Sequence, residues 1–146
     1  MRTVVFDIDG TIADNSHRKV WVEQKPKNWK RYNENMVDDG VHEDIVSLMV
    51  MLSATNKIVL CTGREDVYAA ETWRWLDYND LAHLIHDIYM RPTKDYRSDA
   101  IVKVELLGKI TEDHGRPWLW FDDRQQVVDA VRAQGIRVLQ VAEGNF

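Results

Sequence analysis

Phe6-Asp7-Ile8-Asp9-Gly10-Thr11 is the stretch that decides the fold, and it follows directly on two apolar residues, Val4 and Val5. An apolar strand here delivers two carboxylates to its carboxyl end, and a glycine-containing turn then leads the chain away. Alternate residues of a strand point to opposite faces, so the two acids converge only if the strand ends between them. Open α/β sheets bind ligands outside the carboxyl ends of their strands. The stretch is compatible with such a site, although acidic turns after strands are common without one.

Three further segments downstream strengthen this interpretation. Residues 58–64 form a second apolar strand that ends in Thr62-Gly63-Arg64, and residues 118–124 form a third that ends in Asp122-Asp123-Arg124. Lys103 lies between them in a helical stretch. Each apolar run is short enough for a buried strand and is bounded by polar residues.

Together the four segments resemble the four motifs of the haloacid dehalogenase (HAD) superfamily of phosphotransferases. The last 26 residues, FDDRQQVVDAVRAQGIRVLQVAEGNF, resemble more specifically the phosphatase domain of phage polynucleotide kinase-phosphatases. The resemblance covers nearly the whole chain and is weakest between Asp14 and Gly40. It implies an α/β, Rossmann-like, three-layer α/β/α fold with a central parallel sheet. Residues 1–146 are expected to form a single HAD-like phosphatase domain, with residues 12–40 as a small cap inserted after the first strand.

The residue pattern predicts alternating strands and helices, which give a parallel sheet with right-handed crossovers. Ile45, Leu48, Met49 and Leu52 fall at helical spacing within residues 42–53. The remaining expected strands cover residues 2–6, 87–90 and 136–141, and the remaining expected helices cover 65–78, 98–110 and 125–134. In the helix at 65–78, Ala69, Trp73 and Leu76 should share the core face. Residues 12–40 contain too many polar residues for a core segment, and a short helix capped by Asn28 is expected within them.

The resemblance also assigns roles to the polar residues. Asp7 is expected to attack phosphorus and form an aspartyl-phosphate, and Asp9 to act as general acid and then general base. Thr62 and the next backbone N–H would hold a phosphate oxygen, and Lys103 would neutralise Asp7 and the phosphate. Mg²⁺ is the expected cofactor, because an anionic nucleophile needs its repulsion from phosphate cancelled. The expected ligands are Asp7, Asp9 through its backbone carbonyl, and Asp122, with Asp123 as a ligand or a partner of one.

Several of these assignments have structural alternatives. The pair Asp122-Asp123 could instead be a helix N-terminal acid pair that faces the helix dipole. Lys103 could be a solvated helical lysine, and Lys109 is a rival for its role. The candidate substrate-binding residues are Thr11, Gly63, Arg64, Arg18 and Arg97, with Arg91 as a further arginine for the same task.

The charge distribution bears on the substrate. The net charge of −5 argues against broad wrapping of duplex DNA, which depends on many basic contacts to phosphate. Between His17 and Asn33, however, there are six basic residues against one acid, and they are interleaved with Trp21, Trp29 and Tyr32. Such a run is either a solvated face or a site for single-stranded nucleic acid. In the second case it would track backbone phosphates and stack a terminal base.

Other sequence features narrow the class. One cysteine rules out an intramolecular disulfide and a zinc cluster, no apolar run approaches the length of a membrane span, and no signal peptide is evident, so a cytoplasmic location is expected. No G-x-x-x-x-G-K-[ST] motif occurs, so this chain lacks the kinase half of the phage enzyme. A separately encoded kinase or ligase is therefore an expected partner.

The leading hypothesis is a magnesium-dependent phosphomonoesterase that acts on a nucleic acid 3′-phosphate. A 5′(3′)-nucleotidase that uses the same residues on nucleoside monophosphates is the alternative. A third hypothesis is a catalytically silent module that binds phosphate or docks another enzyme. The presence of the full set of acids and cations argues against it: Asp7, Asp9, Thr62, Lys103 and Asp122.

Overall fold

The computed structural model describes all 146 residues and is built on a five-stranded sheet with the order β5-β4-β1-β6-β7. Every neighbouring pair of strands is parallel. The strands are β1 (Arg2–Phe6), β4 (Asn56–Glu65), β5 (Ile85–Arg91), β6 (Leu119–Asp122) and β7 (Val138–Gln140). The chain moves outward from β1 through β4 to β5, then returns to the other side of β1. The strand order therefore reverses beside β1, where open α/β sheets leave a crevice for ligands.

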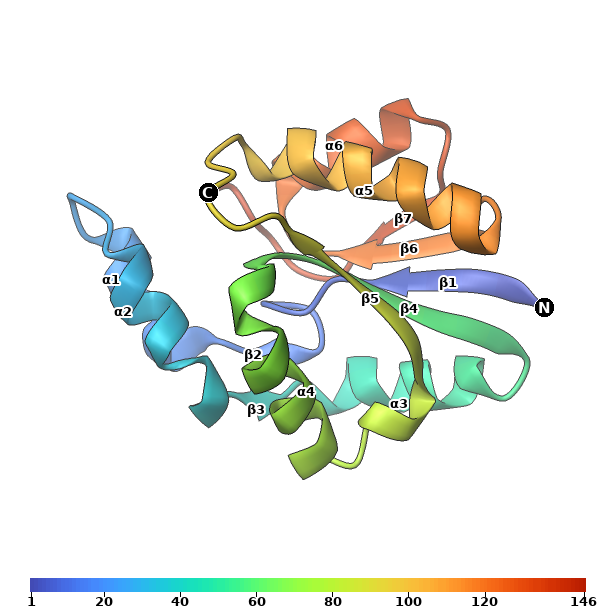
Figure 1. Ribbon diagram of the computed structural model, residues 1–146, viewed down its shortest axis with the longest axis horizontal. Helices are drawn as coiled ribbons and strands as arrows, with labels where there is room; N and C mark the ends of the chain where they lie inside the picture. Colours follow the sequence, from blue (N-terminus) through green and yellow to red (C-terminus); the bar gives the residue numbers. More distant parts are fainter.

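Helices cover both faces of the sheet, which confirms the predicted three-layer arrangement (Figure 1). On one face lie α5 (Asp99–His114) and α6 (Gln125–Ala133), and on the other lie α3 (Glu43–Ser53) and α4 (Ala69–Tyr78). Val5 packs with the first pair, whereas Val4 and Phe6 pack with the second. Adjacent residues of β1 thus fill opposite layers, which is why its sequence is apolar throughout.

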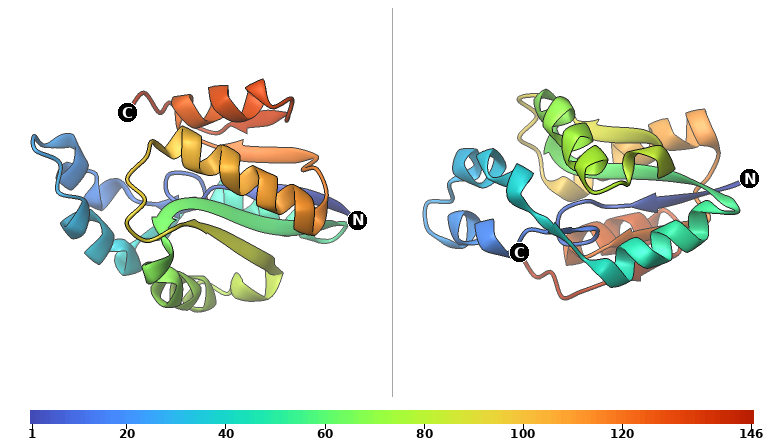
Figure 2. Two further views of the ribbon diagram at one scale, coloured as in Figure 1. Left: turned by 45° about the horizontal axis from the view of Figure 1, so that its top comes forward. Right: turned by 90° about the horizontal axis from the view of Figure 1, so that it is seen from below.

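The insertion between β1 and α3 forms a separate group of short elements. These are β2 (Ala13–Asp14), η1 (Ser16–Arg18), α1 (Val20–Glu23), α2 (Trp29–Glu34), η2 (Met36–Asp38) and β3 (Gly40–Val41), with β2 and β3 paired antiparallel. The Asn28 side chain accepts a hydrogen bond from the Arg31 backbone N–H and caps α2, as predicted. In all views α1 and α2 lie beyond the carboxyl ends of the strands (Figure 2).

Two expectations about burial are wrong. Ile12, Ala13 and Met36 are buried, so the insertion does contribute to the core. The helix α4 begins at Ala69 after the turn η3 (Asp66–Tyr68), and it buries Trp75 rather than Trp73, while Leu76 is buried as predicted. The indole N–H of Trp75 donates to the Asp39 carbonyl at 2.8 Å, and this hydrogen bond satisfies the polar N–H in the interior.

The second predicted strand also extends further than its sequence indicates. β4 continues through Thr62 to Glu65, with an irregularity in its pairing to β5 between those two residues. The turn η4 (Ala82–Leu84) leads into β5. None of the helices is both long and apolar enough to cross a membrane.

Candidate active site

The centre of the site is a buried ion cluster at the carboxyl ends of β1 and β6. The Lys103 ammonium, delivered by α5, donates to Asp7 Oδ1 and to Asp122 Oδ2, each at 2.8 Å. The hydroxyl of Thr11 donates to the other oxygen of Asp7 at 3.0 Å, and the indole of Trp120 donates to Asp122 at 3.2 Å. All these side chains are buried. Lys109, the rival lysine on the same helix, is exposed.

Charges in this cluster perturb one another. Burial, reinforced by Asp122, raises the pKa of Asp7 well above its ordinary value despite the nearby ammonium. Burial alone would lower the pKa of Lys103, but Asp122 and Asp7 outweigh it, so the pKa of Lys103 is raised well above its usual range. Burial and then Asp122 also raise the pKa of Asp123. Negative charge is therefore in excess here.

Three carboxylates of this cluster are placed to share a cation. Oxygen atoms of Asp7, Asp122 and Asp123 all lie within 4.8 Å of one another, and all three residues are buried. Gly10 permits this approach, because its φ is +82° and a Cβ there would overlap the Asp123 carboxylate. Hard oxygen donors are the ligands of Mg²⁺, so the donor set and the surplus of negative charge both fit that ion.

Asp9 is not one of these three carboxylates, and its side chain contacts two buried arginines. Arg64 donates to it through Nη2 at 2.7 Å and Nε at 3.1 Å, and Arg18 donates through Nη2. Burial would raise the pKa of Asp9, but Arg64 and Arg18 outweigh it and hold that pKa well below the ordinary value. Both arginines were predicted to bind substrate, and in this structure both are paired with Asp9.

Asp39 is a site residue that sequence reasoning missed. Its side chain is fully buried and accepts from Arg18 at 2.6 and 2.8 Å, and it also lies 2.7 Å from the His17 ring. The guanidinium of Arg18 lies over the Tyr32 ring at 4.2 Å. Asp39 and Tyr32 therefore fix Arg18 against Asp9. The sequence offers no signal for this, since Asp38-Asp39-Gly40 reads as an ordinary polar turn.

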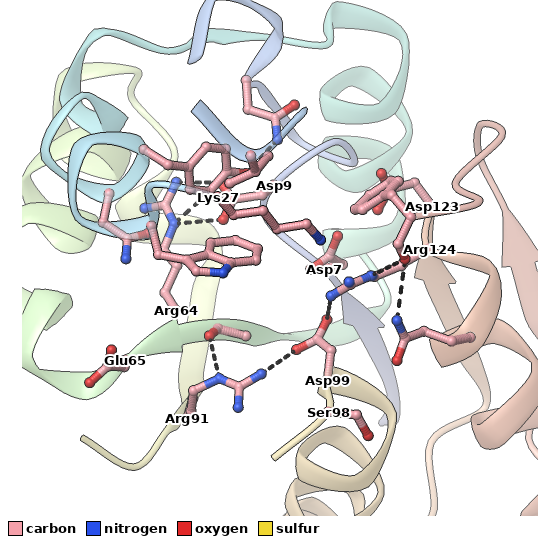
Figure 3. A pocket seen from close by; sticks show the side chains of 18 of the residues that line it. Asp7, Asp9, Lys27, Arg64, Glu65, Arg91, Ser98, Asp99, Asp123 and Arg124 are labelled. Atoms are coloured by element: carbon pink, nitrogen blue, oxygen red, sulfur yellow. Dashed lines mark hydrogen bonds and ion pairs between the residues drawn. The ribbon is translucent and has the colours of Figure 1, made fainter. Parts of the chain in front are cut away.

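Asp99 is a second missed residue. It opens α5 after the Ser98 cap and lies 3.2 Å from Arg91, 3.6 Å from Arg124 and 3.8 Å from Lys103. In Figure 3 the Arg91 and Arg124 side chains approach it from opposite sides. A Cβ on Gly63 would overlap the Asp99 carboxylate, so this predicted residue serves by leaving space. An acid at a helix start is common, which is why the pattern alone did not single it out.

The remaining predicted residues lie less centrally. Thr62 is buried, and its hydroxyl accepts from the backbone N–H of Arg64 at 3.1 Å. Arg97 is exposed at 45% of its side chain and is held by Asp95 and Glu105, at 2.7 and 2.6 Å. Arg97 lines the pocket, whereas Thr62 and Thr11 do not.

A pocket of about 600 Å³ opens above the ion cluster. Its floor includes Asp7, Asp9, Asp122 and Asp123. Its walls come from the insertion, the end of β4, the loop after β5, the start of α6 and the chain end, and they include Lys19, Lys27, Trp29, Tyr32, Arg64, Arg91, Tyr96, Arg97, Asp99, Arg124 and Phe146. The reactive carboxylates are therefore reached through a mouth lined by basic and aromatic side chains.

Fold and site together define the class of protein: this chain is a phosphatase of the HAD superfamily. More narrowly, residues 1–146 match the family model of the polynucleotide kinase PNKP phosphatase domain, and the chain belongs to that family.

Individual relatives agree with this placement. A candidate bifunctional polynucleotide kinase/RNA ligase of Autographa californica nuclear polyhedrosis virus is 25% identical over 130 residues, which cover 87% of this chain and 17% of the viral protein. A chain from the Pnkp1/Rnl/Hen1 RNA repair complex superposes with a TM-score of 0.81 at 28% identity, covering 99% of this chain and 43% of that one. The chain thus spans less than half of either relative.

A more distant neighbour shares the fold alone. The candidate HAD hydrolase YfnB from Bacillus subtilis, solved bound to magnesium, superposes with a TM-score of 0.68 at 11% identity. The superposition covers 97% of this chain and 93% of that protein.

Proposed function

We propose that this phosphatase removes the 3′-phosphate from nucleic acid ends, RNA ends in particular, through an aspartyl-phosphate intermediate. The observation that carries the chemistry is the buried Asp7–Lys103–Asp122 cluster at the floor of an open pocket. The observations that favour a nucleic acid substrate are the family match, the likeness to a chain of an RNA repair complex, and the basic, aromatic mouth of the pocket.

In the first half-reaction Asp7 Oδ attacks phosphorus, the bond to the 3′-oxygen breaks, and that oxygen takes a proton from Asp9. Asp7 is well placed because Lys103 and Thr11 hold its carboxylate in one orientation. Such positioning is a large part of phosphoryl-transfer catalysis.

In the second half-reaction water attacks phosphorus, the bond to Asp7 breaks, and Asp9 takes the proton of the water. The ionised Asp9 held by Arg18 and Arg64 is the form required for this step. Its protonated form is needed only while substrate is bound. The phosphate then lies beside it, and this added negative charge raises the pKa of Asp9 and competes for the two guanidinium groups.

Asp7, Asp122 and Asp123 would hold Mg²⁺, and Asp9 would add its backbone carbonyl, as the family resemblance implies. When bound, the ion supplies positive charge that offsets repulsion between the attacking carboxylate and the phosphate. Lys103 alone cannot offset it, because it already faces Asp7 and Asp122.

We also propose that the chain works with an RNA ligase or kinase activity. Support comes from the relatives, because the viral one is described as a bifunctional polynucleotide kinase/RNA ligase and the other belongs to an RNA repair complex. The phosphatase product, a 3′-hydroxyl end, is the chemical form that a ligation step joins.

The deciding experiment is phosphate release from matched substrates. We expect 3′-phosphorylated RNA oligonucleotides to have a higher kcat/KM than 5′-phosphorylated ones and than nucleoside 5′-monophosphates. Asp7→Asn serves as the background control. A preference for 5′-mononucleotides at every salt concentration would replace this proposal with a nucleotidase.

A further inference from the structure

The basic side chains that line the pocket fall into two groups. Arg64, Arg91, Arg97 and Arg124 each have an acid within 4 Å. Lys19 and Lys27 line the same pocket and form no ion pair with an acid at that distance. Both lysines come from the insertion. Additional phosphate charge on a substrate would therefore find its free partners on this side of the mouth.

The aromatic residues of the insertion are similarly divided. Trp21 lies under the Arg31 guanidinium at 4.4 Å and does not line the pocket, and Tyr32 is buried. Trp29 lines the pocket, is 47% exposed, and has the Lys27 ammonium 5.6 Å from its ring centroid. An exposed indole beside an unpaired cation at a pocket mouth combines the two features that bind single strands.

Trp29 is also fixed relative to the reactive groups. Its ring meets Tyr32 edge-on at 5.5 Å, and the Tyr32 ring carries the Arg18 guanidinium, which donates to Asp9. The side chain of Lys27 extends over the pocket towards Asp7 (Figure 3). The two rings and the Arg18 guanidinium thus connect the mouth to Asp9 on the floor. A preorganised platform of this kind loses little conformational entropy when a base stacks on it.

We propose that Trp29 and Lys27 form a nucleotide subsite that extends the site to polynucleotide ends. Trp29 stacks the base of the terminal, 3′-phosphorylated nucleotide, and Lys27, assisted by Lys19, binds the phosphodiester that joins this nucleotide to the preceding one. The inference rests on the function proposed above. It assigns the strand path to the insertion rather than to the opposite wall, where the arginines are already paired.

The test uses 3′-phosphorylated dinucleotides in four forms: the natural dinucleotide, one with an abasic terminal nucleotide, one with a neutral methylphosphonate linkage, and one with both changes. The wild-type protein should prefer the terminal base by about 5- to 150-fold in kcat/KM, the range for one stacked base. Trp29→Ala should abolish the preference for the base, and Trp29→Phe should retain most of it. Lys27→Gln should abolish the preference for the charged linkage alone.

Matched controls lie outside the pocket. Lys30 belongs to the same insertion but lies 3.9 Å from Glu34, and Trp73 is 39% exposed on α4. Lys30→Gln and Trp73→Ala should leave both preferences intact. If Trp29→Ala lowers kcat/KM equally for base-bearing and abasic substrates, its role is structural and the subsite is refuted. A wild-type protein that cleaves 3′-phosphates with no preference refutes the subsite alone. One that cleaves only 5′-phosphates refutes the proposed function as well.

Discussion

Replacing Lys103 with methionine tests the charge arrangement at the centre of the site. The Lys103 side chain is 1% exposed, and its ammonium is the sole cation within 4 Å of either Asp7 or Asp122. Its removal leaves two buried carboxylates without compensation, and breaking a buried pair in this way costs roughly 3–5 kcal/mol. Methionine keeps an unbranched apolar side chain, so the loss should reflect charge more than a cavity.

The expected loss corresponds to a fall in Tm of about 6–20 °C, since 1 kcal/mol shifts Tm by roughly 2–4 °C in a protein of about this size. The pKa of Lys103 is raised in the folded state. Its contribution to stability is therefore fully present below the ordinary lysine pKa and is lost only as pH rises through the raised value. Urea and thermal unfolding, followed by far-UV circular dichroism at pH 7 in EDTA, measure the whole effect.

Lys109→Met is the matched control, because Lys109 lies on the same helix and is exposed. It should change the free energy of unfolding by less than about 0.5 kcal/mol. Adding Asp122→Asn to the Lys103→Met protein should restore part of its stability, since one uncompensated charge is then gone. If the free energy of unfolding of the Lys103→Met protein in EDTA is within about 1 kcal/mol of the wild-type value, the buried cluster does not form and the site assignment fails.

Three other changes probe the proposed chemistry. Asp7→Asn should abolish phosphate release from a folded protein, and near-wild-type turnover would contradict its role as nucleophile. Asp9→Asn should lower phosphate release by roughly 10²- to 10⁴-fold. A loss under about fivefold would contradict the role of Asp9 as general acid and base. Removal of Mg²⁺ should abolish activity, with Ca²⁺ a poor substitute because it favours looser coordination; full activity with verified absence of metal would exclude the carboxylate site. Gly63→Ala should lower kcat/KM by displacing the Asp99 carboxylate, whereas Gly108→Ala, where a Cβ meets nothing within 4 Å, should raise helix stability by up to about 1 kcal/mol. Equal activity of the Gly63→Ala and wild-type proteins would show that the position of Asp99 does not matter.

Much of the architecture could be predicted from the sequence, for a physical reason. A parallel strand covered on both faces must be apolar along its length, so β1, β4 and β6 stand out as short runs. Their carboxyl ends share one edge of the sheet, so polar residues that follow them lie in one region. This rule and the resemblance to a known family together accounted for the fold. The same rule accounts for the structure bringing Asp7 and Asp122 together.

Amphipathic helices were less predictable in detail. Helix α4 buries Trp75, whereas the sequence predicted Trp73 on the core face. Helical spacing specifies a stripe, but two tryptophans two residues apart compete for it. The choice depended on the Asp39 carbonyl, which accepts the Trp75 N–H from a distant part of the chain.

The partners of charged side chains were decided by tertiary structure alone. Asp38 and Asp39 are equivalent in the sequence, yet only Asp39 is buried, against Arg18. Lys27 and Lys30 belong to the same basic run, yet Lys27 lines the pocket and Lys30 lies beside Glu34. Local sequence determines which residues can carry charge and which segments can be buried. Whether a charge is paired depends on groups brought from other elements, and that depends on how the insertion packs over the end of the sheet.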